Sequence, residues 1–223
     1  MEKLKVVSLI PARGNSKSIL KKNLYPLNGI PLIDFTLKAS TMSIVDETWV
    51  STDDIEIAEH CENFEYFDAP VNVLMRPDYL ATDDATTESV MKHFTENVEY
   101  DIIVLIQATS PMITHRDINN GLEILLVYNY DSVFSVAEAS DMLIWDKETK
   151  KPLNYDPFDR GNRQSRNNNI VIETGGFYIT HRRQFIETEC RMSGSIGFVK
   201  IPFWKMFEVD DIEDAKMIEK LMK

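Results

Sequence analysis

Several basic side chains lie in the polar segment 12–23, which follows an apolar segment that ends at Pro11. Arginine holds phosphate oxygens with a fork of N–H groups, lysine adds a point charge, and glycine lets the backbone approach a phosphate. The segment contains Arg13, Gly14, Lys17, Lys21, Lys22 and Asn23. Its glycine spacing fits neither the P-loop nor the dinucleotide-binding fingerprint. We interpret it as a phosphate-binding loop of another kind, with a solvated basic loop as the alternative.

Gln107 opens the sequence QATSP, directly after the most apolar run of the chain, residues 101–106. A glutamine amide both donates and accepts hydrogen bonds, which suits a sugar hydroxyl or a nucleotide base. The alternative is an ordinary turn before a helix.

Glu208 and Asp210 are separated by one residue in an acidic segment near the end of the sequence. In an extended segment, alternate side chains lie on the same face, so these two carboxylates share a face. Mg²⁺ prefers a few carboxylates together with substrate phosphates. Asp211 and Asp214 fall at the start of the last predicted helix, where carboxylates favour the helix dipole. We therefore expect Asp210 to hold a metal ion and Asp211 and Asp214 to cap the helix.

The histidines and cysteines are predicted to be structural or surface residues. The sequence has four histidines and two cysteines, namely His60, His93, His115, His181, Cys61 and Cys190. Their spacing matches neither a metal site nor a disulfide framework, and no Ser-His-Asp arrangement is visible.

Apolar runs typical of strands alternate with patterns typical of helices up to residue 136. Strands are predicted at 5–11, 48–52, 71–74, 101–106 and 132–136, and helices at 31–40, 55–63, 86–97 and 116–128. This alternation predicts a doubly wound, mostly parallel sheet. In such sheets, ligands bind beyond the carboxyl ends of the strands, which is where segment 12–23 and Gln107 belong.

The pattern breaks at the polar segment 140–169 and resumes after it. Strands are predicted at 176–180 and 197–201, and helices at 182–189 and 211–222. We expect a single domain over residues 1–223, with 140–169 as an insertion. The insertion carries the apolar residues Trp145, Leu153, Tyr155 and Phe158. Burial against a second copy explains them better than exposure does, so we expect a homodimer; the alternative is a flap folded back on its own domain.

Composition narrows the class of protein. The chain has 223 residues, of which 43% are hydrophobic, and its formal net charge is −12. This charge argues against nonspecific binding to nucleic acid, which needs a basic face. No apolar run reaches the roughly 18 residues that a membrane span needs, and no signal-peptide pattern is visible. We therefore expect a cytoplasmic protein that partners neither nucleic acid nor membrane.

Taken in order, these segments resemble the acylneuraminate cytidylyltransferase (CMP-sialic acid synthetase) family. Each motif is weak alone, but the ordered set is specific and covers nearly the whole chain. The matching segments are IPARGNSK at 10–17, KN at 22–23, GIPLI at 29–33, STDD at 51–54, RP at 76–77, LATD at 80–83, LIQATSP at 105–111, RQ at 163–164, ETGGFY at 173–178 and EVD at 208–210.

The resemblance implies a Rossmann-like nucleotidyltransferase that couples CTP to a nine-carbon 2-keto acid sugar. It implies that Arg13, Lys17 and Lys22 hold the CTP phosphates. It further implies that Asn23, Arg76 and Thr87 line the cytidine side, that Gln107, Arg163 and Tyr178 face the sugar, and that Asp210 with Glu208 holds Mg²⁺ or Mn²⁺. Segment 140–169 corresponds to the dimerisation region of the family.

Three departures from the family pattern leave alternatives open. Glu208 stands where an aspartate is usual, Thr174 replaces an asparagine, and no lysine for the sugar carboxylate is evident in 136–145. The sugar can be N-acetylneuraminate, a deaminated sialic acid, or a legionaminate-type or pseudaminate-type acid. The rival functions are a CMP-Kdo-type synthetase, which the opening loop disfavours, and a nucleotide-binding regulatory protein of the same fold without turnover.

Overall fold

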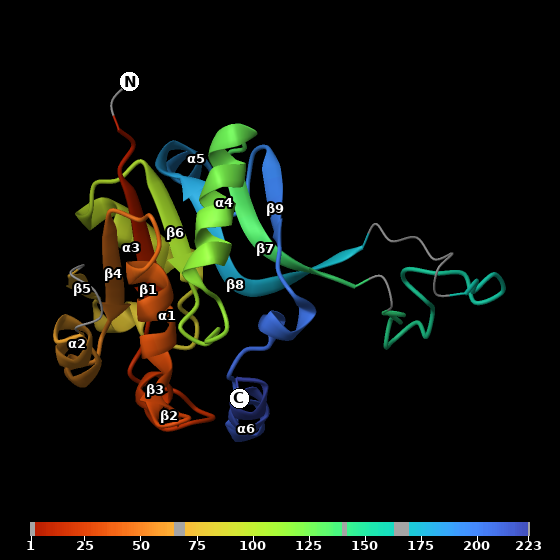
Figure 1. Ribbon diagram of the computed structural model, residues 1–223, viewed down its shortest axis with the longest axis horizontal. Coiled ribbons are helices and arrows are strands. Elements are labelled where there is room, and N and C mark those ends of the chain that lie inside the picture. The colour runs from red at the N-terminus through yellow and green to blue at the C-terminus, as the bar shows by residue number, and fades with distance from the viewer. Residues whose placement is uncertain (1–2, 65–69, 140–141, 163–169, 223) are drawn as a thin grey trace.

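A central sheet of seven strands organises the chain in this computed structural model, which describes residues 3–64, 70–139, 142–162 and 170–222 (Figure 1). The strand order is β5-β4-β1-β6-β8-β7-β9. The strands are β1 (Val6–Pro11), β4 (Glu47–Thr52), β5 (Val71–Met75), β6 (Ile102–Ile106), β7 (Ser132–Glu138), β8 (Val171–His181) and β9 (Ile196–Lys200). A separate antiparallel pair is formed by β2 (Pro26–Leu27) and β3 (Ile30–Pro31).

All neighbouring strands of the main sheet are parallel except those that flank β8, which is antiparallel to both β6 and β7. The predicted fold class is therefore confirmed. The direction of β8 is a finding that strand patterns alone did not predict. The described part of the insertion, residues 142–162, contains no helix that could serve as the crossover that a parallel neighbour needs.

Helices cover both faces of the sheet, and their positions agree with the predicted segments to within a few residues. They are α1 (Leu32–Thr41), α2 (Ile55–Glu62), α3 (Thr87–Asn97), α4 (His115–Val127), α5 (Arg182–Thr188) and α6 (Ile212–Leu221). Short 3-10 turns are η1 (Lys22–Leu24), η2 (Asp78–Leu80) and η4 (Phe203–Met206). Within the described residues, no helix has the length and apolarity that a membrane crossing requires.

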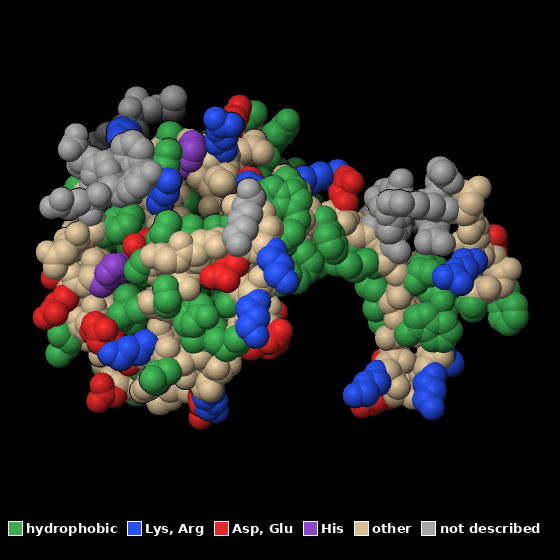
Figure 2. All heavy atoms as spheres, turned by 60° about the horizontal axis from the view of Figure 1, so that its bottom comes forward, with side chains coloured by type: hydrophobic (Ala, Val, Ile, Leu, Met, Phe, Trp, Pro, Cys, Tyr) green, Lys and Arg blue, Asp and Glu red, His purple; other side chains and the backbone are tan. Residues whose placement is uncertain are grey.

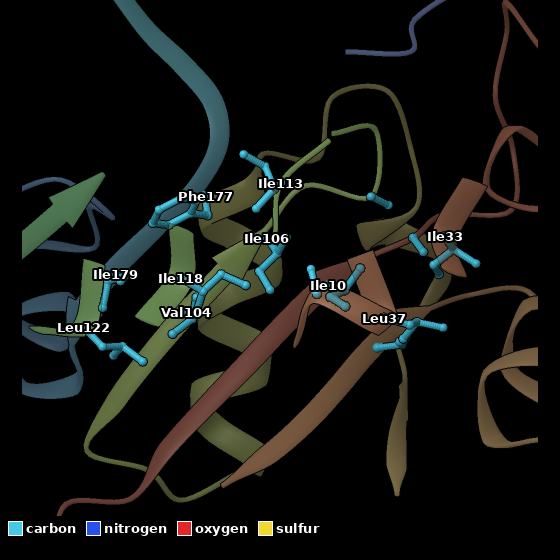
Figure 3. Close-up of a cluster of buried hydrophobic side chains, with 14 of the residues drawn as sticks. Ile10, Ile33, Leu37, Val104, Ile106, Ile113, Ile118, Leu122, Phe177 and Ile179 are labelled. Carbon is cyan, nitrogen blue, oxygen red and sulfur yellow. The ribbon is translucent and has the colours of Figure 1, made fainter. Parts of the chain in front are cut away.

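Strand β6 separates two apolar clusters. Its five residues are fully buried, and they alternate between the clusters as the pleat requires. Val104 and Ile106 lie in the cluster with Ile10 and Leu37, together with residues of α4 (Figure 3). Ile103 and Leu105 point to the opposite face, into the cluster that includes residues of α3 and α5. This buried strand fixes the position of Gln107, which directly follows it.

A third apolar cluster joins the C-terminal helix to the first loop. Ile19 and Leu27 pack with Val209 and Ile218. The backbone N–H of Val209 also donates to the carbonyl of Thr109, at 2.8 Å. Segment 208–211 is therefore held between the first loop and the loop after β6.

The insertion leaves the main body between the ends of β7 and β8 and extends away from it (Figure 1). Its described part, residues 142–162, contains one antiparallel bridge between Trp145 and Pro152, and Trp145 packs edge-on against Tyr155. Phe158 is 99% exposed. The described insertion is thus not folded back on its own domain. The prediction of one domain over 1–223 stays a prediction.

Candidate functional site

A cleft of about 260 Å³ opens at the carboxyl ends of β1 and β6. Six of the residues predicted to bind or act on substrate line this cleft: Arg13, Lys22, Asn23, Arg76, Thr87 and Gln107. They come from separate parts of the chain and meet because parallel strands end at a common edge.

Arg13 and Lys17 share one carboxylate, that of Asp83. The Arg13 Nη1 atom lies 2.9 Å from Asp83 Oδ1 and 3.3 Å from the carbonyl of Thr82, and Lys17 Nζ lies 2.6 Å from Asp83 Oδ2. Hydrogen bonds from Lys17 and then Arg13 hold the pKa of Asp83 below its usual value. Lys17 lies in an adjoining hollow of about 560 Å³ that also borders Arg13. Sequence reasoning did not identify Asp83, although it ends the LATD run.

The end of β4 holds the first loop in place. The N–H of Gly14 donates to Asp53 Oδ1 at 3.0 Å. A Cβ atom at Gly14 would lie 2.6 Å from Asp54 Oδ2, so only glycine fits this approach. The Asp54 side chain accepts from the N–H of Ile57 and caps α2.

Lys22 and Lys21 face different surroundings although they are adjacent. The Lys22 side chain is only 15% exposed, and its Nζ lies 3.2 Å from Asp210 Oδ1. Lys21 is about half exposed, lies outside the cleft lining and pairs with Glu56 on α2. Lys22 opens the 3-10 turn η1, so it is held by structure rather than carried on a free loop.

Asn23 and Arg76 form the buried wall of the cleft. Asn23 Nδ2 donates to the carbonyl of Arg13 at 2.9 Å. Arg76 donates to the carbonyl of Ser51 at 2.9 Å and to that of Leu80 at 3.3 Å. Burial lowers the pKa of Arg76 to about 10. Its Nε atom is buried and has no hydrogen-bond partner within the described part of the chain.

Glu208 and Asp210 differ in exposure. Glu208 Oε1 accepts a 2.8 Å hydrogen bond from the hydroxyl of Ser110, and it lies so close to Gly175 (φ +74°) that a Cβ there would approach it to 2.6 Å. Burial, and then the negative charge of Asp210, raises the pKa of Glu208. The Asp210 side chain is 71% exposed. Asp210 is therefore accessible to solvent, whereas the Glu208 carboxylate is enclosed.

The remaining acidic residues near α6 cap the helix, as predicted. Asp211 accepts from the backbone N–H groups of Glu213 and Asp214, and Asp214 accepts in return from the N–H of Asp211. Among the residues that the structure describes, no group of three or more His, Cys, Asp or Glu could hold a metal ion. Asp210 and Glu208 alone fit only a metal that also takes oxygens from a bound phosphate.

Tyr178 lies in β8, opposite Leu105 of β6, and only 4% of it is exposed. Its hydroxyl donates to the carboxylate of Glu173. It does not line the cleft, and its predicted contact with a sugar stays a prediction. Arg163, the other residue predicted on the sugar side together with Gln107, lies outside the described residues.

The cysteines and His60 fit the structural roles expected of them. Both cysteines are free, and burial raises the pKa of Cys61 to about 12, so its thiol stays protonated at neutral pH. His60 lies 2.5 Å from the carboxylate of Asp34 and joins α2 to α1.

Comparison with protein families matches residues 7–171 to the family described as cytidylyltransferase. Similar curated proteins are N-acylneuraminate cytidylyltransferases. The protein from Oncorhynchus mykiss is 34% identical over 81% of this chain, and form A from Danio rerio is 32% identical over 82%. The protein from Escherichia coli O18:K1:H7 is 26% identical over 83% of the chain. The matches span only 42–44% of the length of these relatives.

Two solved structures share the fold. A CMP:2-keto-3-deoxy-manno-octonic acid synthetase complexed with CTP superimposes with a TM-score of 0.72, covering 98% of each chain at 18% identity. A 4-diphosphocytidyl-2C-methyl-D-erythritol synthase from Anaerococcus prevotii gives a TM-score of 0.67 at 12% identity, covering 97% of this chain and 95% of its own. At these identities the likeness concerns the fold alone.

Proposed function

Because this chain belongs to the cytidylyltransferase family, we propose that it joins the CMP part of CTP to a nine-carbon 2-keto acid sugar and releases pyrophosphate. The sugar is sialic acid or a related nonulosonate, as the names of the curated relatives suggest. The observation that carries the proposal is the cleft in which Arg13, Lys22 and Gln107 meet at the strand ends.

The reaction needs positioning and positive charge more than a covalent intermediate. The anomeric hydroxyl of the sugar attacks the α-phosphate of CTP, its proton passes to water, and the bond from the α-phosphate to the leaving pyrophosphate breaks on the opposite side. Negative charge grows on the leaving group, and Arg13 and Lys22 are the cations placed in the cleft to stabilise it. No protein nucleophile is required.

The same cleft offers distinct surfaces for the two substrates. Asn23, Arg76 and Thr87 line the cleft, and we assign them to the cytidine side as the resemblance to the family implies. Gln107 is assigned to the sugar side, together with Tyr178 and Arg163.

Asp83 and Asp210, which pair with the cations of the cleft, must release those cations when the triphosphate binds. Asp83 pairs with both Arg13 and Lys17, and Asp210 pairs with Lys22. A triphosphate carries more charge than one carboxylate and offers several oxygens to an arginine fork. We infer that CTP takes Arg13 and Lys17 from Asp83 as it enters.

Asp210, with Glu208 behind it, is the pair that fits Mg²⁺ or Mn²⁺ held jointly with substrate phosphates. When bound there, the ion supplies charge to the phosphates and acidifies the attacking hydroxyl. Asp210 is the better ligand because it is exposed, whereas Glu208 is enclosed and accepts a hydrogen bond from the hydroxyl of Ser110.

We also propose that the protein is a homodimer joined through the insertion. The described insertion extends from the body and exposes Leu153 and Phe158 as well as half of Trp145. Figure 2 views the molecule from a second side and places apolar side chains of the insertion at its surface, across a gap from the main body. A second copy would cover this apolar surface.

Pyrophosphate release from CTP, measured with and without an acid sugar, tests the function. The panel contains N-acetylneuraminate, a deaminated sialic acid, legionaminate-type and pseudaminate-type acids, and Kdo. We expect turnover with a nine-carbon acid and CTP, little with UTP because base-edge groups are left unpaired, and loss of turnover in excess chelator.

Each other outcome of this assay has a definite meaning. Turnover of Kdo alone supports the CMP-Kdo-type alternative. CTP binding without turnover of any acid sugar supports a regulatory protein. Equal turnover of UTP and CTP contradicts the proposal.

A further inference from the structure

The carboxylate of Asp83 contacts two cations of the first loop through separate oxygens. Its Oδ1 atom accepts a 2.9 Å hydrogen bond from Arg13, and its Oδ2 atom lies 2.6 Å from Lys17 Nζ. Within the described part of the chain, Asp83 pairs with no other cation. In the proposed reaction both cations pass to the phosphates of CTP, so the charge of Asp83 is then left beside a triphosphate.

Asp83 lies at the boundary between the cleft and the adjoining hollow. Arg13, Thr82 and Asp83 line both cavities, whereas Lys17 lines only the hollow. An anion confined to the cleft therefore reaches Arg13 alone, and an anion that also reaches Lys17 must extend past Asp83. In the proposed reaction, the phosphate chain of CTP and the pyrophosphate released from it are the anions that can contact both cations.

The two ion pairs of Asp83 are accessible to solvent. The side chain of Asp83 is 49% exposed, and that of Lys17 is 81% exposed. Because exposed pairs contribute little to stability, a ligand anion can replace the carboxylate at small cost. Hydrogen bonds from Lys17 and then Arg13 hold the pKa of Asp83 below its usual value, so the carboxylate is charged at neutral pH. It is therefore a weak competitor for both cations that is always charged.

We propose that Asp83 competes with the phosphate chain for Arg13 and Lys17 and thereby limits how tightly the protein holds pyrophosphate. The proposal rests on the proposed function and assigns Asp83 a part in product release. Any ligand that takes both cations displaces the same carboxylate, so its affinity is lowered by the same factor. CTP also binds through its cytidine part, which pyrophosphate lacks. The carboxylate pairs with both cations again once pyrophosphate has left.

The test compares Asp83→Asn with the matched control Asp78→Asn. Asparagine keeps the shape of the side chain and removes its charge. Asp78 is exposed and also lines the hollow, but it is not among the partners of Arg13 and Lys17 in the described structure. Its replacement therefore reports the general effect of one negative charge fewer. Asp83→Glu keeps the charge, and Asp83→Ser is the second neutral variant if Asp83→Asn does not fold.

Calorimetry measures the binding of CTP and of cytidine, and inorganic pyrophosphate is measured as a competitor of CTP. The buffer contains a chelator, so that only the cations of the protein hold the phosphates. It also contains about 0.15 M salt, which screens charges that are not in contact. Cytidine carries no phosphate and reports the cytidine side alone. Thermal unfolding shows that each variant is folded.

We expect Asp83→Asn to bind pyrophosphate about threefold to tenfold more tightly than the wild type, the scale for losing two exposed ion pairs. The affinity for CTP should rise by a similar factor, and the affinity for cytidine should stay within about twofold of wild type. Asp78→Asn should change the affinity for pyrophosphate by less than about twofold. Asp83→Glu should match the wild type.

Unchanged or weaker binding of pyrophosphate by Asp83→Asn overturns the inference, because Asp83 then positions the cations instead of competing for them. An equal gain in Asp78→Asn also overturns it, as does an absence of competition between pyrophosphate and CTP in every variant. These binding results do not depend on turnover. A wild type that binds CTP but turns over no acid sugar refutes the proposed function, whereas this inference is decided by the competition with pyrophosphate.

Discussion

Adjacent residues of the first loop have unlike environments, and this difference decides which side chains can act on a nucleotide. Lys22 is largely enclosed beside Asp210 in the cleft, whereas Lys21 reaches Glu56 on α2. Asn23, the next residue, is buried and holds the backbone of Arg13. A single shift of register would exchange these roles, so substitutions at neighbouring positions test the assignment directly.

We expect Lys22→Ala to lower kcat by roughly 10²-fold or more, the scale for losing one preorganised charge contact in the transition state. Arg13→Ala should lower kcat and also weaken CTP affinity, because Arg13 lines the cleft directly after β1 and is the residue that we propose to hold a phosphate of CTP. Lys21→Ala is the neighbouring control and should change little. Steady-state kinetics of the three variants measures this, and a crippled Lys21→Ala beside a near-normal Lys22→Ala would show that the assignment is off by one residue.

Glu208 gives the stability of the protein a predictable pH dependence. Burial raises its pKa in the folded chain, so the folded state binds this proton more tightly than the unfolded state does. The stabilising contribution is full below the unfolded value of 4.5 and is lost as pH rises through the raised folded pKa. Glu208→Gln removes the buried charge and should therefore raise Tm at pH 7 to 8.

The Tm difference between Glu208→Gln and wild type should shrink as the pH falls towards 4, where Glu208 is protonated. Thermal unfolding followed over this pH range is the measurement. Glu187→Gln changes an exposed carboxylate on α5 and is the control. A Glu208→Gln variant less stable than wild type at pH 8 would contradict the account.

At the scale of elements, the end of β4 performs two tasks with adjacent aspartates. Asp54 caps α2, and Asp53 accepts the backbone N–H of Gly14 in the first loop. The close approach of Gly14 to Asp54 requires that β4 and β1 stay in register, and five residue pairs link these strands. The conformation of the first loop therefore depends on the neighbouring strand β4 as well as on the sequence of the loop.

We expect Asp54→Ala to lower mainly the stability of the protein and Asp53→Ala to weaken mainly CTP binding. Asp54→Ala loses a helix cap and should lower the free energy of unfolding by about 1 kcal/mol, while Asp54→Asn should preserve most of it. Asp53→Ala should loosen the first loop and raise the KM for CTP with a smaller effect on unfolding. Chemical denaturation and kinetics on the same variants check both effects; equal loss of stability in Asp53→Ala and Asp54→Ala would refute the division.

At the scale of the whole molecule, the insertion is the part that the main sheet does not explain. It begins after β7 and ends before β8, two strands whose pairing contains a register shift between Phe134 and Val136. Its described residues make one short bridge and an aromatic contact of their own. A segment of this kind is better stabilised by a partner than by its own few contacts.

Light scattering at micromolar concentration should give twice the 25.7 kDa mass of one chain. The double variant Leu153→Ser and Phe158→Ser removes two exposed apolar side chains of the insertion and should shift the protein towards the monomer. Val127→Ser, at an exposed apolar position on α4, should remain dimeric. A wild-type mass of one chain, or a double variant as dimeric as the control, would count against the interface.

Sequence by itself determined the order and type of the main-sheet strands and of the α-helices, because apolar runs and helical periodicity are local properties of the chain. It did not predict the short β2–β3 pair. The strands β1, β4 and β6 were predicted to within one residue at their carboxyl ends, which placed Arg13 and Gln107 on the ligand side. The capping roles of Asp211 and Asp214 were also predictable, because helix caps depend on residues a few positions apart.

Only the tertiary structure decided which distant side chains meet. Asp83 reaches Arg13 across 70 positions, Glu208 reaches Ser110 across 98, and Arg191 stacks on Tyr178 because the chain reverses after β8. These pairs depend on strand order, the antiparallel direction of β8 and the packing of α6 against the first loop. Burial raises the pKa of Glu208, whereas Asp210 stays exposed at the surface, and the sequence pattern alone does not distinguish the environments of these two carboxylates.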